Sequence, residues 1–163
     1  MKTILSSAAM ILALSGTAFA EGDVAAGEKD FKKCKSCHTI ADENGEALFK
    51  GGKTGPNLYG VVGRQAGAYE DFKYGDSIVA AGEAGLVWTE ETLVEYIKDP
   101  KGFLKEYTGD SAAKSKMTFK WGKPEDIVAF LATFSSEMSD DGEAAEDEAS
   151  EDEATESDST ATN

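Results

Sequence analysis

The sequence has very few of the residues that bind metals through sulfur or nitrogen. Its 163 residues include two cysteines and one histidine, and Cys34, Cys37 and His38 all lie within five consecutive positions. A structural zinc site needs a fourth ligand and usually a second Cys/His pair, so this supply argues against one. A thioredoxin-like redox motif would be expected in a βαβ context, which the flanking sequence does not suggest.

Long apolar stretches and sustained strand alternation are missing after residue 20. No later segment is therefore predicted to cross a membrane, which takes about 20 apolar residues. Residues 1–20 have an early charge at Lys2, an apolar core from about Ala8 to Leu14 and the small-x-small ending Ala18-Phe19-Ala20. This pattern predicts a cleaved secretory signal peptide, so the mature chain is expected in the periplasm.

Positive charge is missing from the C-terminal segment. From Glu137 to Asn163 there are 12 acidic residues, no basic residue and no aromatic residue. Such a segment cannot offset the entropy of ordering by burial, so residues 137–163 are predicted to form a disordered acidic tail. The simplest role of the tail is solubility, and a sharper hypothesis is competition with acidic partners for lysines of the domain. Residues 21–136 carry 15 Lys and Arg against 19 Asp and Glu and form one domain of ordinary size.

The pentapeptide Cys34-Lys35-Ser36-Cys37-His38 matches the C-x-x-C-H pattern of c-type haem attachment. At this spacing two thiols add to the two haem vinyl groups from one turn of chain, and the histidine lies under the iron as an axial ligand. A plain disulfide remains an alternative in an exported protein. We predict one covalent haem c, attached through Cys34 and Cys37, with its iron bound by His38.

The second axial ligand follows by elimination. A second histidine is absent, Met1 and Met10 leave with the signal peptide, and Met138 lies where the acidic tail begins. Met117 lies in a polar, Lys-rich loop, which is an unusual place for a methionine that only fills the core. We therefore predict Met117 as the second iron ligand. A thioether stabilises ferrous iron and occupies the sixth site, which favours one-electron transfer over binding of oxygen or peroxide.

Three helices are predicted around these ligands. Asp23 is expected to cap a helix that runs into Cys34, and the cost of Gly27 inside it is explained by close approach of another helix backbone. Thr89 is expected to cap a helix from Glu90 to about Asp99. Pro124 is expected to open the last helix as its first residue; its buried stripe comprises Ile127, Phe130, Leu131 and Phe134.

Two further segments are predicted to be loops. Residues 39–68 are rich in glycine and polar residues, and the chain from Pro100, which stops the preceding helix, through Trp121 shows no helix signal. A loop of about 30 residues fits a compact fold when it wraps a large apolar ligand that serves as part of the core.

Taken in order, these motifs resemble the class I cytochromes c, in the larger bacterial form related to mitochondrial cytochrome c. The likeness is strongest to the c-550 and c2 type, which can carry an acidic C-terminal extension. It covers about residues 22–135 and is carried by residues in the family's order: Gly22-Asp23-Val24, Gly27, Phe31, Cys34 to His38, Lys53 to Leu58, Gly63-Arg64, Trp88, Leu93 to Tyr96, Asp99-Pro100, Met117 and Asp126-Ile127.

The resemblance implies an all-α fold, with short helices and long loops wrapped around one covalently attached haem. The first and last helices would cross at Gly27, with Phe31 against Ile127 and Phe130. The chain is longer than the mitochondrial pattern between His38 and Lys53 and between Pro100 and Met117.

The resemblance also implies roles for individual side chains around the haem. The Pro56 carbonyl would accept a hydrogen bond from His38 and fix its ring. Tyr96 would be a hydrogen-bonding neighbour of the Met117 sulfur. The inner haem propionate would be contacted by Tyr74, Trp88, Arg64 and Ser115, because a buried carboxylate requires such donors. Ordinary packing is the alternative for each of these residues.

The segments that contain the predicted iron ligands are locally basic. Residues 29–53 have six lysines against four acids, and residues 101–123 have six lysines against two acids. A positive surface around the haem would steer acidic redox partners, with Lys33, Lys35, Lys116 and Lys120 as the residues to test. The alternative is a scattered, solvated set of charges.

The function expected from these features is that of a soluble, monomeric, periplasmic carrier of single electrons without a membrane anchor. It would not be an enzyme, and net charge and location exclude nucleic acid as a partner. Expected partners are a quinol-cytochrome c reductase and cytochrome c oxidase, or another periplasmic redox protein such as a dehydrogenase or peroxidase. One alternative is a haem enzyme or gas-binding protein with an open sixth iron site, and another is a subunit docked permanently in a larger complex.

Overall fold

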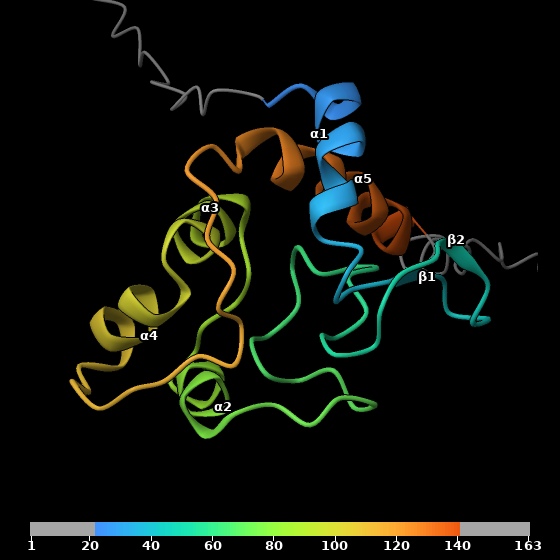
Figure 1. The fold of residues 1–163 in the computed structure, drawn as a ribbon. Helices are drawn as coiled ribbons and strands as arrows, with labels where there is room; N and C mark the ends of the chain where they lie inside the picture. Colours follow the sequence, from blue (N-terminus) through green and yellow to red (C-terminus); the bar gives the residue numbers. More distant parts are fainter. Residues whose placement is uncertain (1–21, 141–163) are drawn as a thin grey trace, which may run out of the picture.

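The computed structural model describes residues 22–140 (Figure 1). The predicted signal peptide lies outside these residues, as does the predicted acidic tail beyond Asp140, and both stay predictions. The elements in chain order are α1 (Val24–Asp30), the 3-10 helix η1 (Phe31–Lys33), β1 (Ile40–Ala41), β2 (Ala47–Phe49), α2 (Asp76–Glu83), α3 (Glu90–Lys98), α4 (Pro100–Thr108) and α5 (Glu125–Asp140). The helical fold with long loops is confirmed. The antiparallel pair β1–β2 is a small addition inside the predicted 39–68 loop.

Helices α1 and α5 cross in close contact, as the glycine at position 27 predicts. A Cβ atom at Gly27 would lie 1.9 Å from the carbonyl oxygen of Asp126, so only glycine allows this approach. The Asp126 carboxylate accepts a hydrogen bond from the backbone N–H of Asp23 at 2.8 Å. The rings of Phe31 and Phe130 pack with their centroids 5.6 Å apart. This crossing fixes the segment that leads into Cys34 (Figure 1).

Helices α1, α3 and α5 begin close to where the caps and the proline predict. The Asp23 side chain accepts from the N–H of Ala26, and Thr89 caps α3 in a reciprocal capping box with Thr92. Helix α5 begins at Glu125, one residue after Pro124, whose carbonyl accepts from Val128 N–H at 2.9 Å. Pro124 therefore lies immediately before the first helical residue rather than at it.

The prediction of a loop from Pro100 to Trp121 is wrong for its first nine residues, which form α4. Pro100 does end α3, but it also opens α4, because a proline in the first turn gives up no helical hydrogen bond. Asp99 ends one helix and caps the next by accepting from Gly102 N–H at 3.1 Å. Helix α2 was not predicted; its buried residues, Ala81 and Gly82, are too small to form an apolar stripe.

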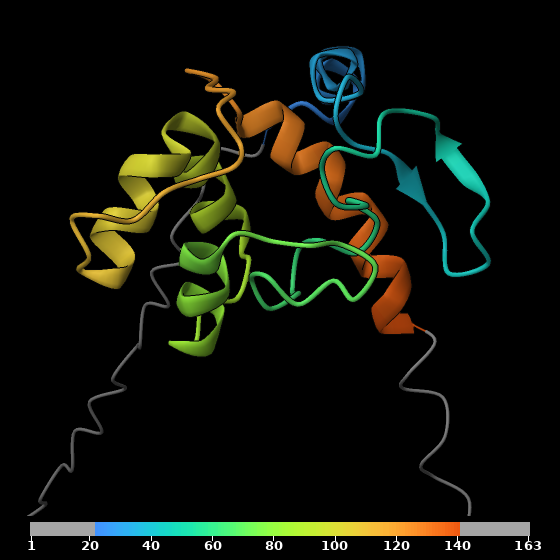
Figure 2. The same ribbon diagram turned by 60° about the horizontal axis from the view of Figure 1, so that its bottom comes forward.

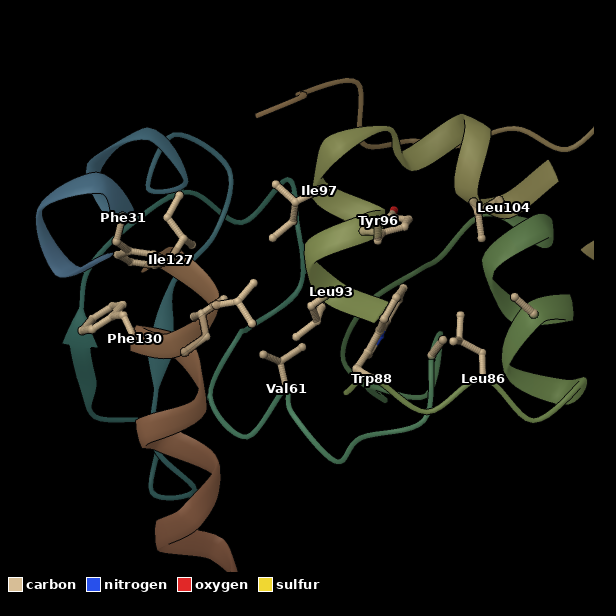
Figure 3. Packing of buried hydrophobic residues seen from close by; sticks show 14 of the residues in the cluster. Phe31, Val61, Leu86, Trp88, Leu93, Tyr96, Ile97, Leu104, Ile127 and Phe130 are labelled. Carbon is tan, nitrogen blue, oxygen red and sulfur yellow. The ribbon is translucent and has the colours of Figure 1, made fainter. Parts of the chain in front are cut away.

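The buried residues form one cluster, in which Val61, Leu93 and Ile97 lie between two larger groups. Figure 3 shows one group between α1 and α5, with Phe31, Ile127 and Phe130, and another between α2, α3 and α4, with Leu86, Trp88 and Leu104. Helices α2 to α4 lie together on one side of α5, and the β1–β2 pair lies on the other (Figure 2). Among residues 22–140, no helix combines the length and the apolar character needed to cross a membrane.

Candidate cofactor site

One cavity of about 350 Å³ brings together every residue that the sequence predicts for the site. Cys34, Cys37 and His38 come from the turn after η1, and Met117 comes from the loop between α4 and α5. Eight residues of the apolar core also line the cavity: Val61, Trp88, Leu93, Tyr96, Ile97, Leu104, Ile127 and Leu131. The cavity therefore has apolar walls with sulfur and imidazole donors at its edge.

The attachment turn presents two thiols in different surroundings. The backbone N–H groups of Cys37 and His38 both donate to the carbonyl of Cys34, at 3.1 and 2.9 Å, and this forms one tight turn. Burial raises the pKa of the Cys34 thiol to about 11. Hydrogen bonds from Thr54 and Ser36 lower the pKa of the exposed Cys37 thiol. Both cysteines are free thiols in the structure rather than partners in a disulfide.

The His38 ring is fixed through one of its two nitrogens. Its Nδ1 lies 2.9 Å from the carbonyl oxygen of Pro56, as expected, and a carbonyl accepts only from a protonated nitrogen. Burial lowers the pKa of His38, and the hydrogen bond to Pro56 partly opposes this shift. The ring is therefore held neutral with its proton on Nδ1, which leaves the Nε2 lone pair for a metal ion.

A glycine-rich strap, residues 51–56, holds the attachment turn by its backbone. The N–H of Gly52 donates to the Lys35 carbonyl, and the N–H of Gly55 donates to the Cys37 carbonyl, both at 2.8 Å. A Cβ atom at Gly51 would lie 1.9 Å from the His38 carbonyl oxygen, and one at Gly55 would lie 2.3 Å from Cε1 of the His38 ring. Sequence reasoning missed this contact; the signal was three glycines within five residues.

Met117 is half-buried and is held by Ser115 and Tyr96. The Met117 backbone N–H donates to Ser115 Oγ, and that oxygen lies 3.2 Å from the hydroxyl of Tyr96. Tyr96 was predicted to be a neighbour of the methionine sulfur, and Ser115 to be a propionate contact. The structure joins the two residues to each other, so Tyr96 supports the Met117 backbone through Ser115, and the two predicted roles toward the sulfur and the propionate stay predictions.

The cavity also has a part-buried positive charge on Arg64. Arg64 donates to the carbonyls of Asn57 at 2.8 Å and Tyr59 at 3.4 Å, and within residues 22–135 no ion pair joins it to a carboxylate. Burial lowers the pKa of Arg64 and raises that of Tyr74, and the nearby Arg64 charge partly opposes the Tyr74 shift. A part-buried guanidinium with no carboxylate partner among these residues suits an anionic group bound in the cavity.

The residues present fit a haem and do not fit a zinc ion. No cluster of three or more His, Cys, Asp or Glu side chains in residues 22–140 could hold a metal ion by itself. Two thiols beside a large apolar cavity, a neutral imidazole, a thioether and an uncompensated guanidinium are the groups that a covalent porphyrin with acidic substituents requires. The individual roles toward the haem stay predictions for all the site residues: Cys34, Cys37, His38, Pro56, Arg64, Tyr74, Trp88, Tyr96, Ser115 and Met117.

Known proteins similar to this chain are cytochromes. No protein-family model matches the chain. It is 58% identical over 135 residues to cytochrome c-551 of Roseobacter denitrificans, which covers 80% of this chain and 96% of that protein. It is 55% identical over 135 residues to cytochrome c2 of Rhodobacter capsulatus, covering 82% and 98% of the two chains. The crystal structure of ferric cytochrome c-550 from Paracoccus versutus matches with a TM-score of 0.68 and 58% identity, covering 71% of this chain and 99% of that one.

Proposed function

We propose that this protein works as a single-electron shuttle in the periplasm. The chain belongs to the class I cytochromes c of the c-550 and c2 type, and it is an electron carrier with one covalent haem c. In this proposal residues 1–20 are a cleaved signal peptide, residues 21–136 form the carrier domain, and residues 137–163 form a solvated acidic tail. The chain is proposed to be a carrier and not an enzyme.

Four residues are proposed to hold the cofactor. Cys34 and Cys37 attach it covalently, while Nε2 of His38 and the sulfur of Met117 bind its iron. When bound, the haem supplies a couple that takes up and returns one electron between ferrous and ferric iron. Pro56 keeps the His38 proton on Nδ1, so the ring orientation stays the same in both oxidation states.

Other residues are proposed to keep water and small ligands out. The apolar walls lower the local dielectric constant, and a thioether on the second side would leave no coordination position open for oxygen or peroxide.

Arg64, Tyr74 and Trp88 line the cavity and are proposed to contact the inner propionate. Ser115 lines the cavity too and is proposed to contact the propionate while its bonds to Tyr96 and Met117 support the methionine.

Acidic redox proteins are the proposed partners: a quinol-cytochrome c reductase as donor, and cytochrome c oxidase or another periplasmic redox protein as acceptor. The support is the local excess of lysine in residues 29–53 and 101–123. Of the four candidate lysines, Lys33 pairs with Asp30 and Lys120 pairs with Asp99 at 2.7 Å. Lys35 and Lys116 make no ion pair among the described residues, so their charges are more available for steering than those of Lys33 and Lys120.

The observation that carries the proposal is the single cavity lined by both the attachment turn and Met117. The test is the optical spectrum of the oxidised holoprotein, wild type against Met117→Ala. The weak red band of a bond between sulfur and ferric iron is expected in the wild type and in the control Met138→Ala, and is expected to be absent in Met117→Ala. A wild-type protein that lacks the band and binds carbon monoxide readily when reduced would instead support the open sixth site.

A further inference from the structure

The chain that contains Met117 has no regular structure between α4 and α5, so its position depends on a few contacts. Before Met117, Lys116 Nζ donates to the carbonyls of Lys73 at 2.8 Å and Tyr74 at 3.0 Å. After Met117, Thr118 and Phe119 are exposed, and the next contacts with the rest of the domain are made by Lys120 and Trp121. The second half of this loop is therefore held at residues 120 and 121.

Trp121 joins three parts of the structure. Its backbone N–H donates to the Ile97 carbonyl at 3.0 Å, which ties the loop to α3. Its indole N–H donates to the Lys123 carbonyl at 2.8 Å, and its ring stacks on Phe119 with centroids 6.2 Å apart and planes within 8°. Lys33 Nζ lies 4.1 Å from the centroid of the Trp121 ring, within the range of a cation–π contact.

The Lys33 contact links the two sides of the cofactor site. Lys33 is the last residue of η1 and directly precedes Cys34, so a group bound to it moves with the attachment turn. Its ammonium group is paired with the Asp30 carboxylate of α1, which limits the positions it can take. Both residues belong to the segment that packs closely on α5 through Gly27 and the bond from Asp23 N–H to Asp126.

We propose that Trp121 is a positioning residue that holds the Met117 loop against the attachment turn through Lys33. This inference rests on the proposed role of Met117 as an iron ligand. Trp121 itself does not line the cavity, whereas its partner Lys33 does. Its effect is on how often the loop opens, because opening must break the ring contacts with Lys33 and separate the loop from Ile97. The chemistry of the site in the closed state is unchanged.

The test is the rate at which free imidazole binds to the oxidised holoprotein. Imidazole enters only after the loop opens, so the observed rate should level off at high imidazole at the rate of loop opening. Trp121→Ala should raise this limiting rate about tenfold, and Lys33→Met should raise it about two- to fivefold, as expected for loss of aromatic and cation–π contacts. Trp121→Phe should recover most of the wild-type rate.

Matched controls separate this role from general destabilisation. Lys32→Met removes an exposed lysine next to Lys33 and should leave the limiting rate unchanged. Every variant should keep the red sulfur–iron band, because the closed state is the same. Since Lys33 is exposed, Lys33→Met decides the question even where Trp121→Ala folds poorly.

Two results would overturn the proposal and are distinguishable. If the band is present in the wild type but Trp121→Ala and Lys33→Met bind imidazole at the wild-type limiting rate, the Trp121 contact does not hold the loop, and the proposed function stands. If the wild type lacks the band and its imidazole binding does not level off, Met117 is not a ligand and both proposals fail.

Discussion

The two sides of the cofactor cavity are held by different kinds of contact. On the attachment side, residues 34–58, the strap and the turn are joined through their backbones, by bonds such as Gly52 N–H to the Lys35 carbonyl and Leu58 N–H to the Thr39 carbonyl. On the methionine side, residues 109–123, one backbone bond joins the loop to α3, from Trp121 N–H to the Ile97 carbonyl, and the other anchors are side chains such as Lys116, Lys120 and the Trp121 ring.

This difference indicates that the two sides differ in stability. Backbone bonds between close-packed segments break only when the segments separate, whereas exposed ion pairs and lysine contacts contribute little each and are weakened by salt. Local opening should therefore begin on the methionine side. A covalently attached cofactor suits this arrangement, because the attachment side alone keeps it in place while the methionine side opens.

The largest expected effect is on the attachment side, from Gly51→Ala. The added Cβ atom would lie 1.9 Å from the His38 carbonyl oxygen and 2.8 Å from the Lys35 carbonyl oxygen, so the strap must move away from the turn. We expect the free energy of unfolding to fall by about 3 kcal/mol, as in severe overpacking. Denaturant unfolding of the oxidised holoprotein, followed by tryptophan fluorescence, measures the change.

The control for this variant is a glycine on the methionine side. A Cβ atom added at Gly122 would meet no heavy atom within 4 Å, and Gly122 has no positive φ, so Gly122→Ala should be neutral or should stabilise by about 0.5 kcal/mol. A loss of less than about 1 kcal/mol in Gly51→Ala would show that the strap adapts easily. The contrast between the two sides would then be lost.

A smaller effect is expected from Asn57→Ala, also on the attachment side. The Asn57 amide accepts from the N–H of Ala41 at 3.0 Å and donates to the carbonyl of Ala41 at 2.7 Å, and thus ties the residue directly after the strap to β1. It also accepts from Tyr59 N–H at 3.1 Å. Loss of these bonds leaves part-buried backbone groups unpaired and should cost about 2 kcal/mol of unfolding free energy.

Two measurements show whether this cost is confined to the attachment side. Asn44→Ala, in the exposed turn between β1 and β2, should change the unfolding free energy by about 0.5 kcal/mol or less. The limiting rate of imidazole binding should stay at its wild-type value in Asn57→Ala, because no contact of the Met117 loop is touched. A faster limiting rate would mean that the two sides open together.

The same contrast explains what the sequence could and could not predict. The sequence could place the attachment turn, its histidine and Met117 at one site, because the chain has only two cysteines and one histidine and the other three methionines could be set aside. The structure brings these residues to one cavity, and their roles toward the haem stay predictions. Helices α1 and α3 were predictable because their caps, Asp23 and Thr89, are local signals. Helix α2 was not, because it packs through Gly82, where a Cβ atom would lie 1.9 Å from the Ala66 carbonyl oxygen. A buried glycine has no hydrophobic signature.

The contacts of the methionine side were beyond sequence reasoning for a different reason. The lysines were recognised as a basic cluster, but their partners are distant in the chain: Lys116 bonds to the carbonyls of residues 73 and 74, and Lys120 bonds to Asp99. Asp99 caps α4, and the sequence had predicted a loop where this helix begins. Because α4 was missed, the position of Asp99 and its ion pair with Lys120 could not be predicted.

The smallest expected effect is a pH dependence on the methionine side. The hydrogen bond from Lys120 holds the pKa of the Asp99 carboxyl below its ordinary value, with help from Gly102 N–H. Because the folded-state pKa is depressed, the pair stabilises the fold above the unfolded-state pKa, and this contribution is lost as pH falls through the folded-state pKa. The unfolding free energies of wild type and Lys120→Gln should thus differ slightly at neutral pH and converge in acid.

The cost of Asn57→Ala should not change with pH, because only amide and backbone groups take part. A Lys120→Gln difference that stays constant into acid would show that the lysine acts by packing its stem and not through its charge.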